Sequence, residues 1–599
     1  MSQYTPPLRD MQFVLHEVLQ VEQAFKAMPA HAELDADTIN AVLEEGGKFA
    51  SEVLFPLNRE GDEVGCTLDP QTHAVTTPPG FADAYRQFVA GGWAALSCDP
   101  DYGGQGLPVT LNQAIYEMLN SANQSWTMYP GLTHGAYDAL HAHGTPEQKA
   151  TYLPKLTSGE WTGTMCLTEP HAGTDLGLLR SKAEPQGDGT YRITGEKIFI
   201  SSGEHDMAEN ILHLVLARLP DAPIGSRGIS LFIVPKFHVN ADGSVGERNG
   251  IYCGAIEHKM GIHGNSTCQM VLDGAVGSLV GEPHKGLAAM FVMMNSARLG
   301  VGMQSLGLTE VAYQNAAAYA KDRTQSRALS GAKAKDKAAD PIIVHPDVRR
   351  MLMIQRATSE GCRALAVWVA RALDEQTHHP DPETRKAAED LVGLMTPIVK
   401  ALLTDIGFEN ANLGMQVLGG HGYIREHGME QYVRDARIAQ IYEGTNGIQA
   451  LDLVGRKLGM NGGRALRRFF HPVSDYVTER AEDKDLAPFV GPLAKALGRL
   501  QLATAEVARK GMSNPDEAGA AATDYLRLFG LTALAYMWAR MAEIAAAKVA
   551  AGEDGNGFYA AKLATAHFFM DRVLPQTGAL FSQISAGATS MMALDEAAF

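Results

Sequence analysis

One carboxylate in the last third of the chain has neighbours that could make it a base. Glu443 lies in the stretch RDARIAQIYEGTNGIQ, between apolar residues and the small step Gly444–Thr445. Because apolar neighbours keep water from a carboxylate, they penalise its charged form and raise its pKa toward neutrality. Such a base can remove a weakly acidic proton at physiological pH, and the glycine lets another molecule approach the backbone. A glutamate beside a glycine is more often a helix-terminal or loop acid. This stretch alone therefore does not identify a catalytic base, and other motifs are needed to support that function.

Length and charge limit the kinds of protein that this chain can be. A chain of 599 residues is too long for one hydrophobic core, so three or four domains are expected. A net charge of −17 argues against nucleic acid and anionic membranes as partners. The sequence has neither a long uninterrupted apolar run nor a basic N-terminal region followed by one. We therefore predict no membrane span, no secretory signal and a cytoplasmic location.

The cysteines and histidines do not suggest a metal centre or a disulfide framework. Six cysteines are scattered without a CxxC pair, which favours a reducing compartment. His134, His141 and His143 lie in THGAYDALHAHG without an acid at ligand spacing. They are interpreted as surface or packing residues, and no metal site is predicted.

Changes in the pattern of the sequence divide the chain into four parts. Residues 1–160 have the three- and four-residue apolar spacing of helices. Residues 161–285 contain short alternating or apolar runs bounded by turn residues, which predict a β domain. Residues 286–460 return to long helices that would form a bundle carrying Glu443. Residues 465–599 are alanine-rich and helical, and we find no chemical cluster there, so a packing or dimerisation domain is expected.

Some local features of these parts can be predicted individually. YRITGEKIFIS is expected to form a hairpin that turns at Gly195–Glu196. Helices are expected to begin near His345 and Pro382, with Pro397 kinking or restarting the second of them. Three methionines, Met290, Met293 and Met294, are expected to fill a core.

Five strings in order make the chain similar to the acyl-CoA dehydrogenase family. They are MCLTEPHAGTD, GEKIFISSG, EHKMGIHGNSTCQMVLDG, QVLGGHGY and RDARIAQIYEGTNGIQ. The resemblance implies a mainly α fold with a central β domain: an N-terminal helical domain, a β-barrel-like middle domain and a helical bundle. The extra C-terminal helical domain resembles a large bacterial subgroup that includes fatty acyl-CoA and 3-methylmercaptopropionyl-CoA dehydrogenases.

The implied reaction is α,β-dehydrogenation of an acyl-CoA thioester to a trans-2-enoyl-CoA. By the resemblance, Glu443 is the catalytic base, and its backbone N–H and a flavin ribityl hydroxyl donate to the thioester carbonyl. Such donors stabilise the charge that develops on that oxygen. The β-hydrogen leaves as hydride to flavin N5, and the electrons pass to electron-transferring flavoprotein.

The resemblance also assigns FAD contacts. The ring would lie against Met165, Leu167 and Thr168, with Phe199 in place of a stacking tryptophan and Ser201 in place of a threonine. Gly173 and Thr174 match residues that contact the flavin phosphate and the substrate.

Other matches imply that FAD is bound between chains. Arg323, Gln416 and Gly420 match contacts to the pyrophosphate and adenosine diphosphate across a subunit interface, and Thr445 matches a pyrophosphate donor. The protein would therefore be a homo-oligomer, at least a dimer.

Asn295 and Arg298 match positions near the CoA portion of the substrate. The family usually has aspartate at the position of Asn295. Thr174 and Gly444 complete the implied substrate contacts. Gly447 and Ser326 replace residues that relatives use near the cofactor. The sequence does not reveal which acyl chain is accepted.

Two alternatives share this architecture. An acyl-CoA oxidase would be reoxidised by O₂ and release hydrogen peroxide. A non-catalytic acyl-CoA-binding protein would keep the fold without the reaction, although the retained Glu443 and flavin motifs argue against it.

Overall fold

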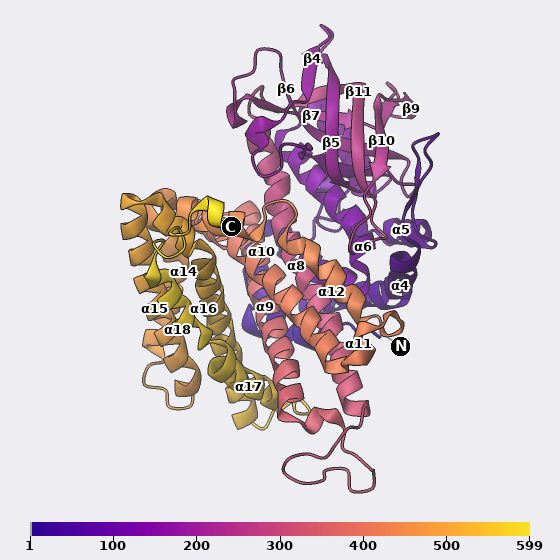
Figure 1. The fold of residues 1–599 in the computed structure, drawn as a ribbon. Coiled ribbons are helices and arrows are strands. Elements are labelled where there is room, and N and C mark those ends of the chain that lie inside the picture. The colour runs from indigo at the N-terminus through magenta and orange to yellow at the C-terminus, as the bar shows by residue number, and fades with distance from the viewer. Residues whose placement is uncertain (1–2) are drawn as a thin grey trace. The chain divides into compact units, whose positions relative to one another are not determined.

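The computed structural model describes residues 3–599 and divides them into two compact units. The first unit comprises residues up to Gly47, Pro108–Ser121 and Val301–Phe599; the second comprises Lys48–Leu107 and Ala122–Gly300. Helices predominate, and the strands gather in one region of the chain (Figure 1). The predicted class, mainly α with a central β domain and extra C-terminal helices, is confirmed.

The second unit contains a curved seven-stranded sheet. Its strands are β3 (Trp161–Cys166), β4 (Lys182–Pro185), β5 (Thr190–Ser201), β6 (Asn210–Arg218), β7 (Ile229–Pro235), β10 (Ile251–Ile256) and β11 (Thr267–Val280). The order is β10-β11-β5-β4-β6-β3, and β7 pairs with both β11 and β6. Because β7 joins two strands that the main path separates, the sheet bends back on itself as a barrel does.

Helices and two small strand pairs accompany this sheet in the second unit. The helices are α4 (Phe55–Val64), α5 (Phe81–Ala90), the later part of α6 (Val109–His143), α7 (Pro146–Ser158) and the beginning of α8 (Gly286–Asp322). The strand pairs are β1 (Thr67–Leu68) with β2 (Val75–Thr76) and β8 (Phe237–Val239) with β9 (Val245–Arg248).

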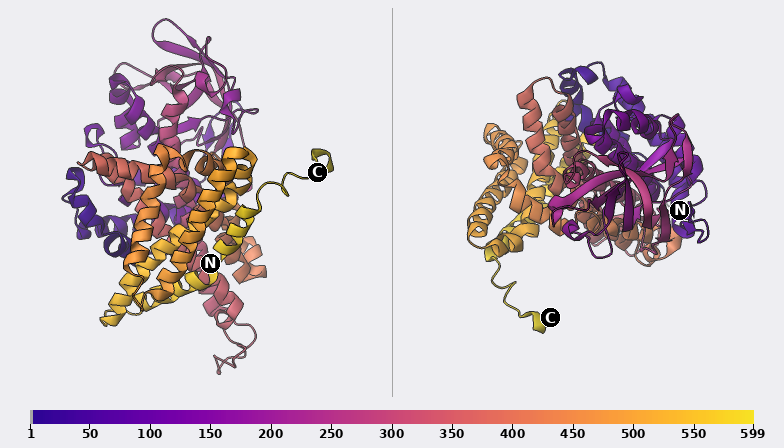
Figure 2. Two further views of the ribbon diagram at one scale, coloured as in Figure 1. Left: turned by 90° about the vertical axis from the view of Figure 1, so that its left-hand side faces the viewer. Right: turned by 90° about the horizontal axis from the view of Figure 1, so that it is seen from above.

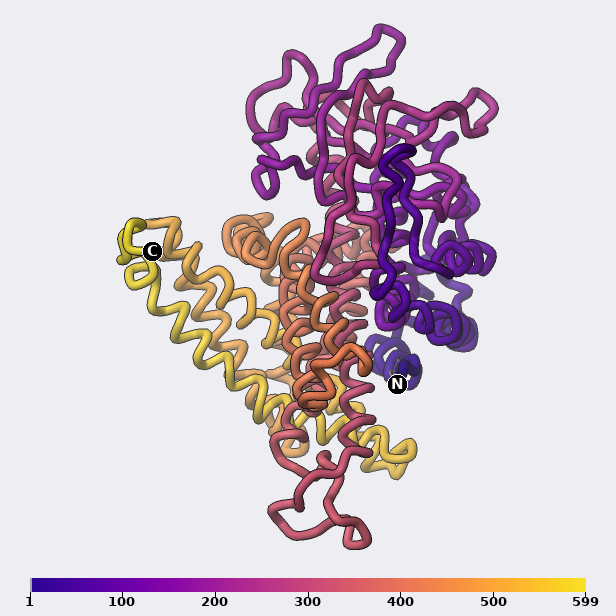
Figure 3. The backbone as a smooth tube through the Cα atoms, turned by 45° about the vertical axis from the view of Figure 1, so that its right-hand side comes forward, coloured from indigo at the N-terminus to yellow at the C-terminus, as the bar shows by residue number. Residues whose placement is uncertain are grey.

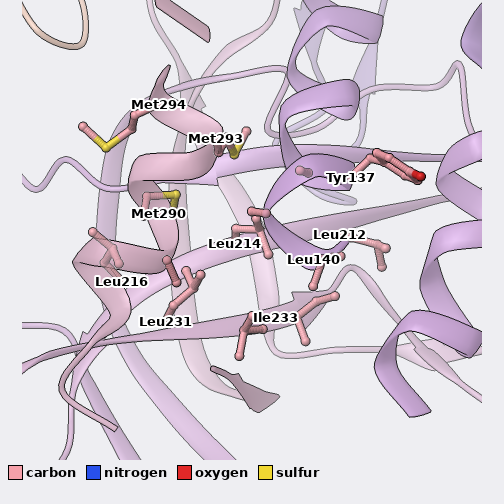
Figure 4. Packing of buried hydrophobic residues seen from close by; sticks show 14 of the residues in the cluster. Tyr137, Leu140, Leu212, Leu214, Leu216, Leu231, Ile233, Met290, Met293 and Met294 are labelled. Carbon is pink, nitrogen blue, oxygen red and sulfur yellow. The ribbon is translucent and has the colours of Figure 1, made fainter. Parts of the chain in front are cut away.

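Methionines of α8 fill the core beside the sheet, as predicted. Met290, Met293 and Met294 are buried among leucines of β6 and β7 and residues of α6 (Figure 4). The thioether side chain adapts to irregular gaps, which suits it to the junction of a helix and a twisted sheet.

The regular elements of the first unit, within residues 3–599, are helices, and one isolated β-bridge joins Thr324 to Pro341. The unit contains α1 (Leu8–Gln12), α2 (Val21–Lys26), α3 (Ala36–Lys48), the start of α6, the rest of α8, α9 (Pro346–His378), α10 (Pro382–Leu418), α11 (Gly420–Tyr423), α12 (Met429–Arg437) and α13 (Asn446–Asp452). The C-terminal helices follow: α14 (Arg464–Glu479), α15 (Ala487–Ser513), α16 (Pro515–Ala550), α17 (Phe558–Phe568) and α18 (Gln576–Ala586). In Figure 2 these run side by side, and the residues after α18 leave the bundle as an extended segment.

Two local predictions are wrong. Residues 190–201 form one continuous strand, β5, because Gly195 is not a turn but a point of close approach: a Cβ there would lie 2.3 Å from Ser181 Oγ. Likewise α10 runs unbroken through Pro397, in the middle of a long and mostly buried helix. The predicted starts near His345 and Pro382 are confirmed by α9 and α10.

Two helices, α8 and α10, are long and apolar enough to cross a membrane by length and composition alone. Half of the most apolar window of α8 and 72% of that of α10 are buried inside the protein. Core helices of globular proteins have this same combination of length and burial.

A buried charge network joins distant parts of the first unit. Arg363 of α9 donates to Glu117 of α6 (Nε–Oε1, 2.9 Å) and to Glu310 of α8 (Nη2–Oε2, 2.8 Å), and also binds Asp10 of α1. Lys562 of α17 binds Asp10 as well. Because a buried charge is costly unless it is paired, each of these contacts constrains the others.

The network has more carboxylates than cations, so one carboxylate favours its protonated form. Glu360 of α9 accepts from Lys562 (Nζ–Oε2, 2.7 Å) and Arg356 (Nε–Oε1, 2.8 Å). The four carboxylates therefore face three cations. Burial raises the pKa of Glu117 to about 7, although Arg363 lowers it.

This raised pKa predicts a pH dependence of stability. Between about pH 4.5 and 7 the folded protein keeps the Glu117 proton and the unfolded chain releases it, so the free energy of unfolding falls as pH rises. The whole effect amounts to about 3 kcal/mol. In Glu117→Gln this fall should be reduced, as measured by thermal unfolding at several pH values; an unchanged profile would contradict the assignment.

Candidate active site

The loop that carries Glu443 is a tight connection between two helical turns. The 3₁₀ turn Ile438–Gln440 ends before it, and α13 begins after it. Gly444 has a φ of +65°, which favours glycine, and its carbonyl accepts from Gln449 (Nε2–O, 2.8 Å). Glu443 is half-buried at this bend.

Asn446 fastens the loop to α10. Its Oδ1 accepts from the buried Lys400 (Nζ–Oδ1, 2.9 Å), and its Nδ2 donates to Asp405 (Nδ2–Oδ1, 2.7 Å). Gln440, on the other side of Glu443, donates to the same Asp405 oxygen (2.7 Å). The loop is therefore held on both sides of the carboxylate, as positioning a base requires. These supporting residues were not predicted, although a lysine within the apolar run TPIVKALL is a usable signal.

A second helix holds the residue before Glu443. The hydroxyl of Tyr442 donates to the side-chain oxygen of Gln304 on α8. Burial raises the pKa of Tyr442, so this hydroxyl keeps its proton. The loop therefore rests on two long helices of the same unit.

In the second unit, the segment predicted to meet the flavin ring ends strand β3. Met165 and Thr168 are half-buried, while Leu167 is buried. The Thr168 carbonyl accepts from the Ile198 N–H (2.9 Å), which ties this segment to β5. The structure therefore brings the Met165–Thr168 segment and the predicted stacking strand together.

A buried ion pair underlies this junction. Lys197 of β5 donates to Glu169 (Nζ–Oε1, 2.9 Å) and to the Leu167 carbonyl (3.1 Å). Burial would raise the pKa of Glu169, but the Lys197 charge and the hydrogen bonds lower it overall. Both residues lie inside the motifs TEP and GEK, yet their pairing was not predicted.

The turn Glu169–Ala172 follows this segment, and the backbone just after the turn is exposed. Glu169 and Ala172 exchange two backbone hydrogen bonds of 3.0 Å, which makes the turn compact. Gly173 and Thr174 beyond it are exposed, and a Cβ on Gly173 would meet no atom within 4 Å. A phosphate or a substrate can therefore approach this backbone.

Phe199 is both exposed and strained. Its side chain is 60% exposed, and its φ is +58°. Lys197 pairs with Met270 and Ile200 with Cys268, so a bulge at positions 198–199 turns Phe199 outward. An exposed aromatic side chain on a strained backbone indicates a ligand-contacting site. Ser201, two residues on, is half-buried at the end of β5.

Phe199→Gly should separate stability from cofactor binding. Glycine removes the cost of the positive φ, which is about 1 kcal/mol, so the protein without cofactor should unfold at a higher temperature. The same change removes the aromatic contact, so FAD should be lost more readily on dialysis. Thermal unfolding and the ratio of flavin to protein absorbance measure the two effects. Phe199→Leu keeps the strain as a control; retention of FAD by Phe199→Gly would contradict the predicted stacking.

The remaining predicted cofactor residues lie in the first unit. Arg323 is exposed just after α8 and forms no ion pair with any residue from 3 to 599. Gln416 and Gly420 are exposed around the turn between α10 and α11. The hydroxyl of Tyr319, on α8, lies 2.7 Å from His421 Nδ1, so the end of α8 adjoins α11. These three residues therefore gather at one end of the bundle, from which the loop between α8 and α9 projects (Figure 3).

Thr445 is half-buried and directly precedes α13. Its backbone occupies the N-cap position, but its hydroxyl does not cap the helix. That hydroxyl can therefore serve another acceptor.

Two predicted substrate residues lie near the beginning of α8. Arg298 is buried and donates to Asn295 (Nη1–Oδ1, 3.3 Å), which is exposed. Its guanidinium lies 5.8 Å from the centre of the Phe291 ring. Within residues 3–599, no group of three or more His, Cys, Asp or Glu residues is placed to hold a metal ion.

Four domain models match the chain in succession. They are the acyl-CoA dehydrogenase N-terminal domain (39–160), middle domain (164–275) and C-terminal domain (284–458), and the acetyl-CoA dehydrogenase C-terminal-like domain (469–595).

Two curated relatives match almost the whole chain. A 3-methylmercaptopropionyl-CoA dehydrogenase of Ruegeria pomeroyi is 44% identical over 98% of this chain and 99% of that protein. The chain belongs to the acyl-CoA dehydrogenase family. A broad-specificity linear acyl-CoA dehydrogenase, FadE5 of Mycobacterium tuberculosis, is 36% identical over the full length of both chains. This member of the family is therefore an oxidoreductase that uses FAD.

A solved structure agrees with the fold. The acyl-CoA dehydrogenase of Bacillus anthracis complexed with FAD matches with a TM-score of 0.74, covering 94% of this chain and 90% of that chain. The sequence identity is 20%.

Proposed function

We propose that this acyl-CoA dehydrogenase family member converts an acyl-CoA thioester to a trans-2-enoyl-CoA, with Glu443 as the base. The observation that carries the proposal is the fastening of the Glu443 loop. Asn446 and Gln440 hold it to Asp405, and Tyr442 holds it to Gln304. A carboxylate fixed in this way can be presented to the α-carbon without a large loss of side-chain freedom.

The residues proposed to hold FAD fit the group chemically. Phe199 offers an exposed flat face for the ring. Met165 and Leu167 offer an apolar contact, and Thr168 and Ser201 offer hydroxyls.

Four further residues suit the phosphates and the adenosine: Gly173, Thr174, Arg323 and Thr445. Gln416 and Gly420 complete the set. An exposed guanidinium such as that of Arg323 matches phosphate in geometry and charge.

The residues of this chain divide the chemistry between them. Glu443 takes the α-proton, and its backbone N–H donates to the thioester oxygen as charge develops there. When bound beside these residues, FAD would supply the acceptor for the β-hydrogen, which leaves as hydride. Asn295 and Arg298 orient the CoA portion, while Thr174 and Gly444 contact the substrate near the reacting carbons.

We also propose the setting in which this reaction occurs. The protein is cytoplasmic and a homo-oligomer, a dimer at least, because Arg323, Gln416 and Gly420 are proposed to reach the FAD of a neighbouring subunit. The functional division of the chain is that predicted from sequence, at 1–160, 161–285, 286–460 and 465–599. Its electrons pass to electron-transferring flavoprotein, as the family resemblance implies.

The acyl group is either a fatty chain or the 3-methylmercaptopropionyl group. The Ruegeria pomeroyi relative supports the sulfur-containing substrate, and the Mycobacterium tuberculosis relative supports linear fatty chains. The higher identity to the former makes methylmercaptopropionyl-CoA the first substrate to test.

One anaerobic experiment tests the proposal. The purified holoenzyme is mixed with acyl-CoAs from short to long and with methylmercaptopropionyl-CoA, and bleaching of the flavin absorbance is followed. Rapid bleaching by at least one of them is expected, with slow reoxidation when air is admitted. Rapid O₂ consumption with hydrogen peroxide release would instead identify an oxidase. A protein that takes up no FAD, or that no acyl-CoA bleaches, would favour the non-catalytic alternative.

A further inference from the structure

The first helix of the C-terminal domain carries a basic pocket. The pocket has a volume of about 330 Å³ and is lined by Arg464, Arg467, Arg468, His471, Pro472 and Asp475. This size lies within the range of small-molecule sites. No chemical cluster was predicted in residues 465–599, whereas successive turns of α14 place these side chains on one face.

A buried carboxylate organises the pocket. Asp390 of α10 accepts from Arg464 (Nη2–Oδ1, 3.0 Å) and from Asn461 (Nδ2–Oδ1, 2.7 Å), and it lies 3.7 Å from Arg468 Nε. These contacts fix two guanidinium groups in place (Figure 1 shows α14 beside the start of α10). Arg467 is exposed and forms no ion pair with any residue from 3 to 599. One cation of the pocket thus remains available to a ligand.

The charge of the pocket contrasts with that of the chain. Three arginines and a histidine gather there with one carboxylate, Asp475, in a protein whose net charge is −17. The guanidinium fork binds phosphate oxygens in pairs, and Arg clusters are the usual protein partner of polyphosphates. The pocket therefore suits an anion with more than one phosphate group.

The residues that support the pocket and the base are spaced by a length similar to part of one such anion. Asp390, which binds Arg464 of the pocket, and Asp405, which holds the Glu443 loop, lie fifteen residues apart on α10, or about 22 Å at the rise of a helix. In an acyl-CoA, an arm of two amide units and short alkyl links separates the thioester from a nucleotide with three phosphates. Extended, that arm spans a similar length.

We propose that this pocket binds the 3′-phosphorylated nucleotide end of the acyl-CoA, so that the C-terminal domain takes part in substrate recognition. The proposal rests on the function proposed above, because it uses the same substrate. Arg467 and His471 contact the phosphates, and Arg464 and Arg468, held by Asp390, shape the site. None of the substrate residues predicted from sequence lies in this domain.

Substrates with and without the nucleotide test the proposal. In Arg467→Ala/His471→Ala, the KM for acyl-CoA should rise about tenfold, the loss expected for charged hydrogen bonds. The kcat, and the KM for the corresponding acyl-pantetheine, should stay unchanged. Arg509→Ala removes an exposed arginine from α15 and serves as the matched control. An unchanged KM for acyl-CoA, or an equal rise for acyl-pantetheine, would overturn the proposal.

A binding measurement separates this proposal from the reaction itself. Titration calorimetry of the holoenzyme with adenosine 3′,5′-bisphosphate should show binding that the double variant weakens about tenfold. ADP and inorganic phosphate should bind more weakly to the wild type. Equal binding of inorganic phosphate would identify a general anion site and overturn the proposal. If no acyl-CoA bleaches the flavin but nucleotide binding still depends on Arg467, the proposed reaction is excluded, while the proposed nucleotide site in the pocket is supported.

Discussion

Glu443→Gln is expected to slow bleaching of the flavin by acyl-CoA by roughly 10²–10⁴-fold, the usual contribution of a general base. Glutamine has nearly the same size and keeps the backbone N–H, but it cannot accept the α-proton. The loop contacts of Asn446 and Tyr442 do not involve the Glu443 side chain, so the fold and the bound FAD should remain. Stopped-flow absorbance under anaerobic conditions measures the rate.

The control for this change is Glu482→Gln, which removes an exposed carboxylate in the loop between α14 and α15. Its bleaching rate should equal that of the wild type. Near-normal bleaching in Glu443→Gln would exclude this residue as the base. Loss of FAD from the variant would instead show that the carboxylate supports the cofactor.

Arg363→Met should produce the largest loss of stability, about 3–5 kcal/mol. The change leaves Asp10, Glu117 and Glu310 buried without the guanidinium that binds all three, whose side chain is only 1% exposed. Methionine fills a similar volume, so the loss reports on charge more than on packing. The unfolding midpoint of the holoenzyme in urea or on heating measures it.

Arg572→Met is a matched control, because Arg572 is exposed on the turn after α17. It should change the midpoint little. A loss below about 1 kcal/mol in Arg363→Met would show that the carboxylates of the network can take up protons at little cost. In that case, lowering the pH should restore stability to the variant.

The order of helical and β segments could be predicted because each has its own period of apolar residues. The starts of α9 and α10 followed from proline, which is preferred at the first helical position. The continuity of β5 could not be predicted, because Gly195 meets Ser181 of a neighbouring segment, and that approach exists only in the folded sheet.

Candidate site residues could be proposed from the sequence where they lie within one motif, as for Glu443, Gly444 and Thr445. The supports of the site were not, because they join residues far apart in sequence: Lys400 contacts Asn446, and Glu169 contacts Lys197. The apolar run around Lys400 indicates that this lysine is buried, but the sequence does not show which residue it contacts. The basic pocket was missed for the same reason, because the residue that organises it, Asp390, lies in another helix.

The contact between Asp10 and Lys562 spans 552 residues of sequence. During synthesis the first helix leaves the ribosome long before α17 is made. Asp10 can therefore bind Lys562 only after almost the whole polypeptide has been synthesised. Contacts of such high sequence separation form late and leave nascent apolar surface open to aggregation. A chain that ends before α17 would leave Asp10 with Arg363 as its cation but without Lys562, so the central charge network is completed only when the C-terminal helices have been made.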